Sequence, residues 1–368
     1  MKYFIGTLLF LHGLIHFAGF LEAFSLMEFK ELSLSISRTA GIVWLLAGIL
    51  ILAFVVFYYQ KSRYLWLIDF LAGSVSVILI ICFWEDAKFG LIPNLFIFGI
   101  SFLSLGSYNF DRLIQQEISA LSIHIPSLSD KKVSAEALEG LPLPVQKWLL
   151  HSGMVGKPFL QVGKITQEAA MRMKPRQKKW LNAKAIQYSR MDLPAFLWTV
   201  NMRMNRFLSF RGRDKFMNGK GEMMIKLNSL FKLVNAKGEK LDEGSMQRYL
   251  GEMVWFPSLA ISEFISWEAI DKTSARATMN YKGPTGTGTF YFNEAGDFIK
   301  FSALRFKDNT EGALRYQWVL KVLDYQTFEG IKVPSEMTAT WKLEKEDWTW
   351  LRLKILNIQY NEHVAFET

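Results

Sequence analysis

The chain has 368 residues, half of them hydrophobic, a formal net charge of +9 and a single cysteine, Cys82. One cysteine excludes an intramolecular disulfide and a cysteine-based zinc site. The mean hydropathy of +0.12 averages two unlike regions. Residues 1–111 contain six Lys or Arg and seven Asp or Glu, whereas residues 112–368 contain 37 Lys or Arg and 27 Asp or Glu. The excess positive charge therefore belongs to the second region.

Four apolar segments of helical length fill the first region: Tyr3–Phe24, Ala40–Tyr59, Leu65–Trp84 and Leu91–Tyr108. Each approaches the ~20 residues that a helix needs to cross the hydrocarbon of a bilayer. The first segment is too long for the core of a cleavable signal peptide and lacks a small-residue cleavage site. We therefore expect residues 1–110 to form a transmembrane bundle of four α-helices.

The flanking Lys and Arg residues give the expected orientation of this bundle. An even number of spans puts both termini on one side. If the N-terminus lies inside, four cations flank the inner ends of the helices and three lie in the outer loops; they are Lys2, Lys61, Arg63 and Arg112 inside, and Lys30, Arg38 and Lys88 outside. This small excess predicts a cytoplasmic C-terminal domain.

Five polar residues within or beside the apolar segments are candidates for an intramembrane role: His12, His16, Asp69, Glu85 and Asp86. The two histidines are one helical turn apart and share a face with small residues, so that face should look into the bundle. They would share a metal, relay protons or hydrogen-bond a neighbouring helix. No metal and no cofactor are predicted, because the other histidines lie outside the spans. Asp69 is near a segment end, where contact with water is the alternative.

Residues 111–155 read as a helical connector between the spans and the rest of the chain. Asp111–Leu121 continues the fourth span, Ser134–Leu138 has the pattern of a short capped helix, and Val145–Leu150 follows Pro144, which is suited to a first helical turn.

Residues 156–368 change from helical periodicity to a period of two, which predicts an antiparallel β domain. Alternation is clearest in Phe196–Met204, Ser274–Tyr281 and Ile331–Leu343. In Trp348–Tyr360 the apolar phase shifts near Ile355 and Leu356, as it does at a β-bulge or in a strand that is buried on both sides. We expect about ten strands in a curved sheet or half-barrel with a few helices. Its concave face is either filled by a packed core, the simpler expectation, or encloses an apolar cavity.

One helix in this domain stands out, Glu243–Trp255, with Asp242 as its cap and Pro257 as its stop. Arg248 and Glu252 are one helical turn apart and can form an ion pair. The basic residue precedes the acidic one, which is the weaker order for stabilising an isolated helix. A role in tertiary packing or in ligand binding is therefore an alternative to an ordinary ion pair. The ligand-binding candidates are Arg248, Tyr249, Glu252, Trp255, Phe256, Trp198 and Asp271. The glycine-rich Gly283–Gly288 is interpreted as a hairpin loop.

The chain resembles a family of uncharacterised bacterial membrane proteins with four N-terminal transmembrane helices. The resemblance is carried by His12-Gly13-Leu14-Ile15-His16 with Gly19-Phe20, by Trp84–Gly90, by Leu141-Pro142 with Pro144-Val145, and by Arg248–Pro257, which reads RYLxExxWFP. It implies this architecture and a multi-pass location in the bacterial cytoplasmic membrane, with no activity attached. The family usually has Gly after Pro175, where this chain has Arg176.

Three classes of function follow from these patterns. The first is a membrane-tethered domain that binds a lipid or another apolar molecule, similar in shape to the half-barrels of bacterial lipoprotein carriers. The second is a membrane-anchored hydrolase that uses Arg248, Glu252 and Asp271 in a charged pocket, although no catalytic motif is present and no catalytic residue is predicted. The third is a purely structural or interaction role, favoured if the sheet interior is full.

The expected partners are the lipid bilayer and an apolar or anionic lipid ligand. The basic segment Lys174–Trp180 either rests on anionic lipid or is a solvated hairpin loop. Nucleic acid is not expected, because no recognised nucleic-acid-binding module is present.

Overall fold

The computed structural model describes residues 2–30, 32–123 and 131–361. Its contacts divide the chain into two compact units, Met1–Leu113 with Asn228–Leu230, and Ile114–Leu227 with Phe231–Thr368. Residues 124–130 of the predicted connector lie outside the described residues.

The first unit is helical, as the apolar segments predict. Its elements are α1 (Lys2–Ala23), α2 (Arg38–Gln60), α3 (Leu65–Cys82), α4 (Trp84–Ala87), the 3-10 turn η1 (Lys88–Gly90) and the start of α5 (Leu91–Ser122). Four helical segments are long and apolar enough to cross a membrane: Lys2–Ala23, Arg38–Gln60, Leu65–Cys82 and Trp84–Ser122.

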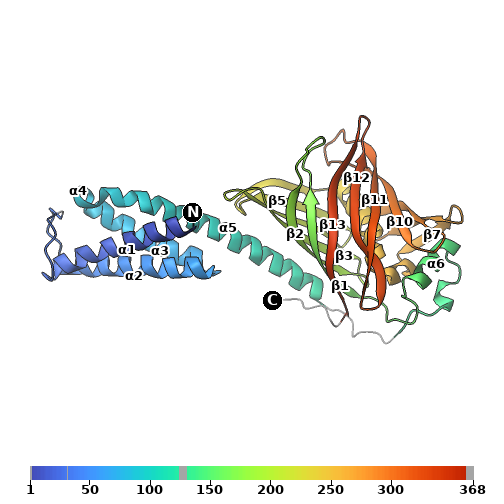
Figure 1. The fold of residues 1–368 in the computed structure, drawn as a ribbon, viewed down its shortest axis with the longest axis horizontal. Helices are drawn as coiled ribbons and strands as arrows, with labels where there is room; N and C mark the ends of the chain where they lie inside the picture. Colours follow the sequence, from blue (N-terminus) through green and yellow to red (C-terminus); the bar gives the residue numbers. More distant parts are fainter. Residues whose placement is uncertain (1, 31, 124–130, 362–368) are drawn as a thin grey trace. The chain divides into compact units, whose positions relative to one another are not determined.

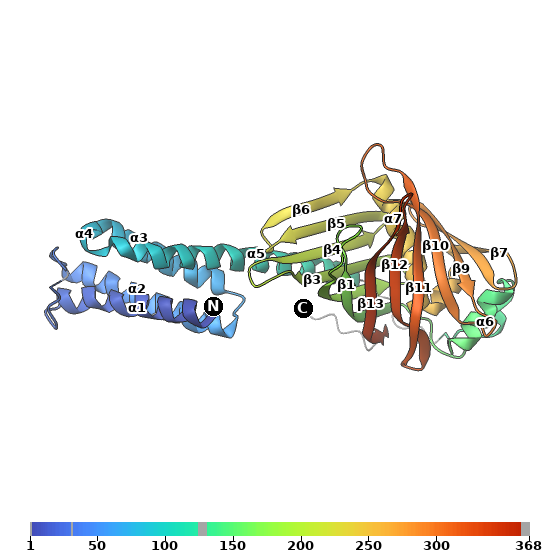
Figure 2. The ribbon, with the colours of Figure 1, turned by 45° about the horizontal axis from the view of Figure 1, so that its top comes forward.

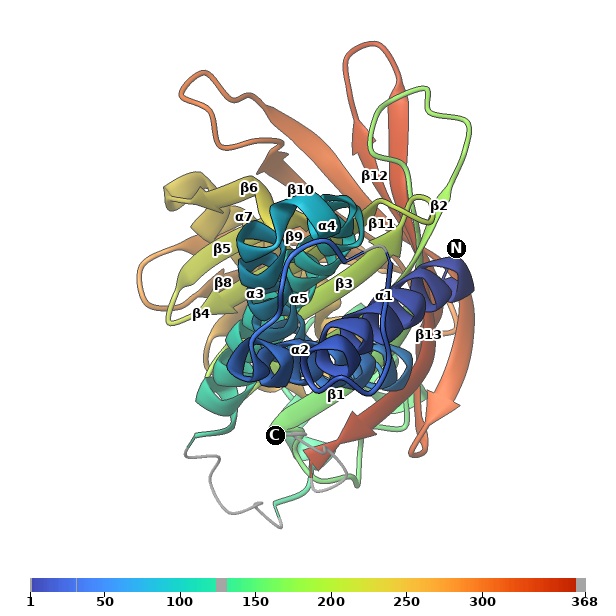
Figure 3. The same ribbon diagram turned by 90° about the vertical axis from the view of Figure 1, so that its left-hand side faces the viewer.

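Small residues let α1 and α2 lie side by side (Figure 3). A Cβ added to Gly19 would lie 2.4 Å from the ring of Trp44, and one added to Gly48 would lie 3.1 Å from the carbonyl oxygen of Gly13. Close helix approach of this kind is how small residues stabilise packing in membranes. The face of α1 that contains His12, His16 and Gly19 is buried, as its spacing predicts.

The second unit is built on one antiparallel sheet of thirteen strands in the order β6-β5-β4-β3-β2-β1-β13-β12-β11-β10-β9-β8-β7. The sheet is curved and unclosed (Figures 1 and 2). Its strands are β1 (Val162–Met171), β2 (Leu181–Arg190), β3 (Ala195–Arg203), β4 (Ser209–Met217), β5 (Lys220–Leu227), β6 (Phe231–Lys237), β7 (Ile265–Ala269), β8 (Ser274–Asn280), β9 (Thr285–Phe292), β10 (Phe298–Phe306), β11 (Arg315–Phe328), β12 (Ile331–Lys342) and β13 (Asp347–Tyr360).

The sheet confirms the predicted curved antiparallel architecture but has more strands than the ten expected. Strands β4 to β6 are rich in charged residues, so burial on one face is not visible as apolar alternation. The predicted bulge is present. Thr166 pairs with Asn357 and Gln167 pairs with Ile355, which leaves Leu356 without a partner in the ladder.

Three short helical elements follow β6: α7 (Glu239–Glu252), η3 (Met253–Trp255) and η4 (Pro257–Ile261). Helix α7 lies against the concave face (Figure 2). Two glycines permit the close approach, because a Cβ on Gly221 of β5 would lie 2.4 Å from Ser245 Oγ, and one on Gly286 of β9 would lie 2.9 Å from Met246 Cγ.

Two sequence interpretations in this region are wrong in part. Helix α7 begins at Glu239 and not at Glu243, with Gly238 at its N-cap position. Asp242 is therefore inside the helix, where it accepts hydrogen bonds from Gly221 N at 2.7 Å and Lys220 Nζ at 2.9 Å. In the glycine-rich segment interpreted as a hairpin loop, Gly283, with a φ of 116°, and Pro284 lie in the turn between β8 and β9. The segment belongs to strand β9 from Thr285 onward, where Gly286 permits the contact with α7.

The convex face of the same sheet carries the C-terminal end of α5. Ile118 and Leu121 pack against Val162, Tyr188 and Leu197. The remaining helical elements, η2 (Glu136–Leu138) and α6 (Leu143–His151), precede β1. The β unit therefore has helix, sheet and helix in successive layers.

A candidate ligand-binding cavity

A cavity of about 490 Å³ lies on the concave side of the sheet, between α7 and strands β3 to β6 and β10 to β13. This volume is typical of small-molecule sites. The lining is mostly apolar and includes six tryptophans: Trp198, Trp255, Trp318, Trp341, Trp348 and Trp350. The interior of the sheet is thus incompletely filled, contrary to the simpler expectation of a packed core.

Arg248 forms the polar base of this cavity. Its Nη1 donates to Asp214 Oδ2 of β4 at 2.6 Å, its Nε donates to Glu252 Oε1 at 2.7 Å, and its Nη2 donates to Gln187 Oε1 at 3.0 Å. Its guanidinium also lies 5.1 Å from the ring centroid of Trp198. The pairing of Arg248 with Glu252 follows the one-turn spacing seen in the sequence.

These bonds keep Arg248 charged although only 14% of its side chain is exposed. Burial alone would lower the pKa of the guanidinium, and the adjacent carboxylates of Glu252 and Asp214 outweigh it and raise the pKa. Glu252 is fixed as well, because its Oε2 accepts a hydrogen bond from Gln187 Nε2 at 2.8 Å. The base of the cavity is therefore a bonded network with little freedom to move.

A row of tryptophans crosses the opposite wall. Trp318 of β11 pairs with Trp341 of β12, which pairs with Trp348 of β13. Two cations at the end of β10 lie over this row: the Arg305 guanidinium is 4.1 Å from the ring centroid of Trp318, and Lys307 Nζ is 5.8 Å from that of Trp348. Arg305 is the last residue but one of β10, and Lys307 is the first residue after the strand.

Arg305 differs from Arg248 in having no carboxylate bonded to it. Within the described residues no hydrogen bond or ion pair is formed by its guanidinium, whose Nε is buried without a partner. Burial and the neighbouring charge of Arg248 lower its pKa to about 10, so the group remains cationic at neutral pH.

Other buried polar atoms of the lining also have no hydrogen-bond partner among the described residues. They include the indole Nε1 atoms of Trp318, Trp348 and Trp350, Nε of Arg172 and Oδ1 of Asp214. In contrast, the indoles of Trp198 and Trp255 donate to Gln167 Oε1 at 2.9 Å and Pro334 O at 3.0 Å. Buried polar groups usually pair, so the wall near Arg305 is rich in unused donors.

The structure brings four of the predicted ligand-binding residues to the cavity: Arg248, Glu252, Trp198 and Trp255. Tyr249 and Phe256 are adjacent in sequence but lie in the core, where the Tyr249 hydroxyl donates to Arg190 O at 2.6 Å and Phe256 packs on Tyr360. Asp271 is exposed in the turn between β7 and β8 and does not line the cavity.

Sequence reasoning missed Arg305 and the row formed by Trp318, Trp341 and Trp348. The available signal was weak. Arg305 lies near the end of strand β10, whose apolar residues appear on both faces. The three tryptophans become neighbours only through strand pairing across β11, β12 and β13.

The predicted intramembrane residues occupy two places in the helical unit. His16 Nε2 is 2.9 Å from Ser76 Oγ, which also accepts from Asn94 Nδ2 at 2.9 Å, so three helices meet in a polar contact. His12 Nε2 lies 3.4 Å from the same hydroxyl. Asp69 is fully buried and does not reach water, and neither of its oxygens has a hydrogen-bond partner among the described residues.

The link residues Glu85 and Asp86 are apart from the histidines. Glu85 is exposed. Asp86 accepts hydrogen bonds from the backbone of Ser33 at 3.0 Å and of Leu34 at 3.1 Å, and so holds the loop between α1 and α2. No group of three or more metal-ligating side chains occurs in the part of the chain that the structure describes.

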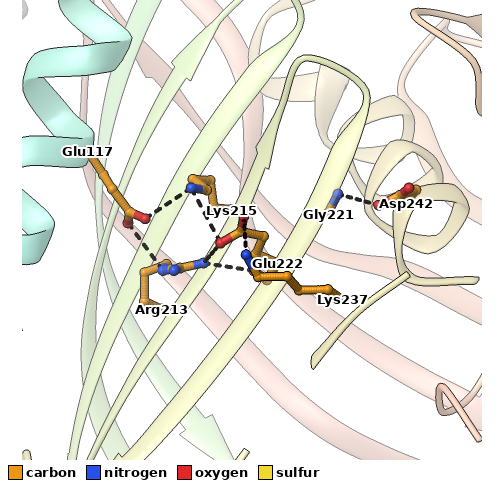
Figure 4. Close-up of polar contacts among 7 residues, drawn as sticks. All are labelled: Glu117, Arg213, Lys215, Gly221, Glu222, Lys237 and Asp242. Carbon is orange, nitrogen blue, oxygen red and sulfur yellow. Dashed lines mark hydrogen bonds and ion pairs between the residues drawn. The ribbon is translucent and has the colours of Figure 1, made fainter. Parts of the chain in front are cut away.

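A cluster of charges on the convex face joins the end of α5 to the sheet (Figure 4). Glu117 pairs with Arg213 at 3.1 Å and with Lys215 at 3.0 Å, and both cations also pair with Glu222. Burial alone would raise the pKa of Glu222, but the hydrogen bond from Lys237 and the charges of Lys215 and Arg213 lower it to about 2. This cluster is separate from the bonds of Arg248.

Comparison with known proteins gives a family match and two distant structural likenesses. The model of a family described as "Family of unknown function (DUF6544)" matches residues 131–353, which leaves the predicted transmembrane segments and the His-Gly-x-x-His stretch outside the match. No curated protein matches the sequence.

Two solved structures resemble the β unit distantly. A LolA superfamily protein from Nitrosomonas europaea is 8% identical, covering 59% of this chain and 94% of its own, with a TM-score of 0.32. A beta-barrel-like protein of the domain of unknown function DUF1849 from Brucella abortus is 10% identical, covering 55% and 99%, with a TM-score of 0.22. Likenesses this distant carry no argument about function.

Proposed function

The chain belongs to this family of unknown function, since the match covers more than half of its length, and from that premise we propose that its β domain binds a lipid or another apolar molecule at a membrane surface. The observation that carries the proposal is the cavity of about 490 Å³ lined by six tryptophans. Apolar and aromatic walls with few polar groups are typical of sites for such ligands.

The helical unit supports the membrane location. Four segments of suitable length and hydropathy tether the β domain to a bilayer. A domain held there meets lipid at high effective concentration. Its net positive charge favours the anionic surface of the cytoplasmic leaflet, and the predicted orientation places the domain on that side.

Surface residues at one end of the sheet also support contact with lipid. Phe207 is 64% exposed, Phe231 is 65% exposed and Leu233 is 53% exposed. The register places them together, because the turn before β4 and the start of β6 both lie beside the end of β5. Arg206 and Lys232 flank them in sequence. Aromatic and basic side chains together are characteristic of the membrane interface.

The geometry around Arg248 supports binding more than hydrolysis. The carboxylates of Glu252 and Asp214 both accept hydrogen bonds from Arg248, and Glu252 also accepts one from Gln187. A general base needs a carboxylate within reach of the proton that it removes, and these carboxylates are instead bonded to a cation.

The test is mass spectrometry of small molecules that co-purify with the full chain after detergent extraction. Ala236 of edge strand β6 lines the cavity, so Ala236→Trp adds an indole there. The neighbouring Asn235 is exposed and does not line the cavity, so Asn235→Trp is the matched control. A bound amphiphile should appear with the wild type and the control and fall severalfold with Ala236→Trp. Equal recovery from all three would contradict the proposal.

A further inference from the structure

We propose that Arg305, with Lys307 beside it over the tryptophan row, recognises an anionic headgroup, so that the ligand is an amphiphile with a phosphate or carboxylate at one end of its apolar chain. This inference rests on the proposed function, because it adds a headgroup preference to the same cavity. The apolar chain would lie along the tryptophans and methionines of the remaining lining.

The charges of the lining favour an anion. It contains six Lys or Arg and three Asp or Glu: Arg172, Arg213, Lys240, Arg248, Arg305 and Lys307 against Asp214, Glu252 and Asp308. Two of the carboxylates, Asp214 and Glu252, bond to Arg248. Arg213 is paired with Glu117 and Glu222 of the convex cluster. The lining charges that remain are Arg172, Lys240, Arg305 and Lys307 against Asp308, so an excess of positive charge is left after these pairs are formed.

Arg305 is held in place without being neutralised by a bonded partner. Its guanidinium lies 4.1 Å from the ring centroid of Trp318 and 5.7 Å from that of Trp341. Stacking on indoles orients a guanidinium and leaves its N–H groups directed along the ring plane. Such a fork binds phosphate or carboxylate oxygens with two parallel hydrogen bonds.

The unused indole donors complement this fork. The Nε1 atoms of Trp318 and Trp348 are buried without a hydrogen-bond partner among the described residues, and Lys307 Nζ lies over the Trp348 ring. A headgroup with several acceptor oxygens would accept hydrogen bonds from more of these N–H donors than an alcohol can. Its bonds would also be stronger, because the acceptor is ionised.

The test uses the full chain in phosphatidylcholine nanodiscs, with empty nanodiscs as background. Saturable binding of the neutral fluorophore N-phenyl-1-naphthylamine reports the cavity, and competition by hexadecyl phosphate and by hexadecanol reports the headgroup. We expect hexadecyl phosphate to displace the fluorophore at about tenfold lower concentration than hexadecanol, a difference of about 1.4 kcal/mol. Palmitate, as the carboxylate probe, should resemble hexadecyl phosphate.

Three variants isolate the role of the charge. Arg305→Gln should bring the concentrations at which hexadecyl phosphate and hexadecanol displace the fluorophore to within about twofold of each other, and Arg305→Lys should retain most of the preference for the phosphate. Arg276→Gln removes an exposed arginine outside the cavity and should behave as the wild type.

The outcomes separate the two proposals. If the wild type shows no saturable fluorophore binding, both the apolar cavity function and the headgroup assignment are wrong. If the fluorophore binds but the phosphate and the alcohol compete equally, or if Arg305→Gln keeps the phosphate preference, only the headgroup assignment is wrong.

Discussion

Arg248 of α7 and Asp214 of β4 face each other across the concave side of the sheet, with Nη1 and Oδ2 2.6 Å apart. The pair joins the helix to the strand at the base of the cavity, and the side chains are only 14% and 20% exposed. The base of the cavity is therefore held by ion pairs. On the opposite wall the guanidinium of Arg305 has no bonded counterion among the described residues.

Replacing Arg248 by methionine should destabilise the β domain strongly. Arg248→Met leaves Asp214 and Glu252 without their cation in a mostly buried place, which costs about 3–5 kcal/mol. The measurement is urea-induced unfolding of the full chain in detergent, followed by tryptophan fluorescence. Arg276→Met, which breaks an exposed ion pair with Glu268, should cost less than about 1 kcal/mol, and equal losses would contradict the structural role of Arg248.

Glu222 makes the stability of the sheet depend on acid pH. Its pKa in the folded domain is about 2, below the 4.5 of the unbonded group. The contribution of the ionised Glu222 carboxylate to the unfolding free energy is therefore complete above pH 4.5 and is lost as the pH falls toward 2. The difference in unfolding free energy between wild type and Glu222→Gln should shrink from pH 6 to pH 3. Lys237→Met should weaken this dependence, and a difference that is constant with pH would refute the assignment.

Arg176 occupies a backbone conformation that suits glycine. Its φ is 61°, in the left-handed region where glycine is favoured. Arg176→Gly should raise the unfolding free energy by up to about 1 kcal/mol, reduced by the loss of an exposed ion pair with Glu346 that is worth little. Glu346→Gln measures that loss alone. Destabilisation by Arg176→Gly larger than that of Glu346→Gln would show that the side chain, and not the φ angle, dominates.

The exposed end of the sheet should report contact with lipid. In a Cys82→Ser background, an environment-sensitive fluorophore on Phe231→Cys should shift to the blue in nanodiscs that contain anionic phosphatidylglycerol, relative to phosphatidylcholine alone. The same fluorophore on Lys272→Cys, an exposed position in the turn between β7 and β8, is the control. Identical spectra at both positions would argue against this surface.

The orientation in the membrane has a direct test with single cysteines. Ser35 is exposed between α1 and α2, and Lys272 is exposed in the β domain. With a cytoplasmic β domain, a membrane-impermeant thiol reagent should label Ser35→Cys but not Lys272→Cys in intact cells. Labelling of Lys272→Cys from outside would reverse the proposed topology.

The periodic features of the sequence predicted much of the fold. Runs of about 20 apolar residues indicate spans because a helix must satisfy its backbone within the segment. Alternation in β3, β8 and β12, and the phase shift in β13 that marks the bulge at Leu356, followed from the two-residue repeat of a strand. Strands β4 to β6 were not foreseen, because ion pairs such as Arg213 with Glu222 take the place of apolar contacts on the convex face.

The candidate site was predictable only where its residues are neighbours in sequence. The pair of Arg248 and Glu252 could be read from one turn of helix, and the motif that contains it also includes Trp255. Asp271, proposed from charge alone, lies in an exposed turn away from the cavity. No local pattern connects Arg248 with Asp214, which are 34 positions apart.

The sequence by itself therefore determined the two kinds of structure and their order along the chain, because helix and strand periodicity are local properties of apolar spacing. Only the tertiary structure decided that the concave face is left partly open and that Arg305 lies over Trp318 and Trp341 on its wall. The physical reason is that cavity volume and the pairing of buried charges depend on strand register and sheet curvature, which bring distant residues together.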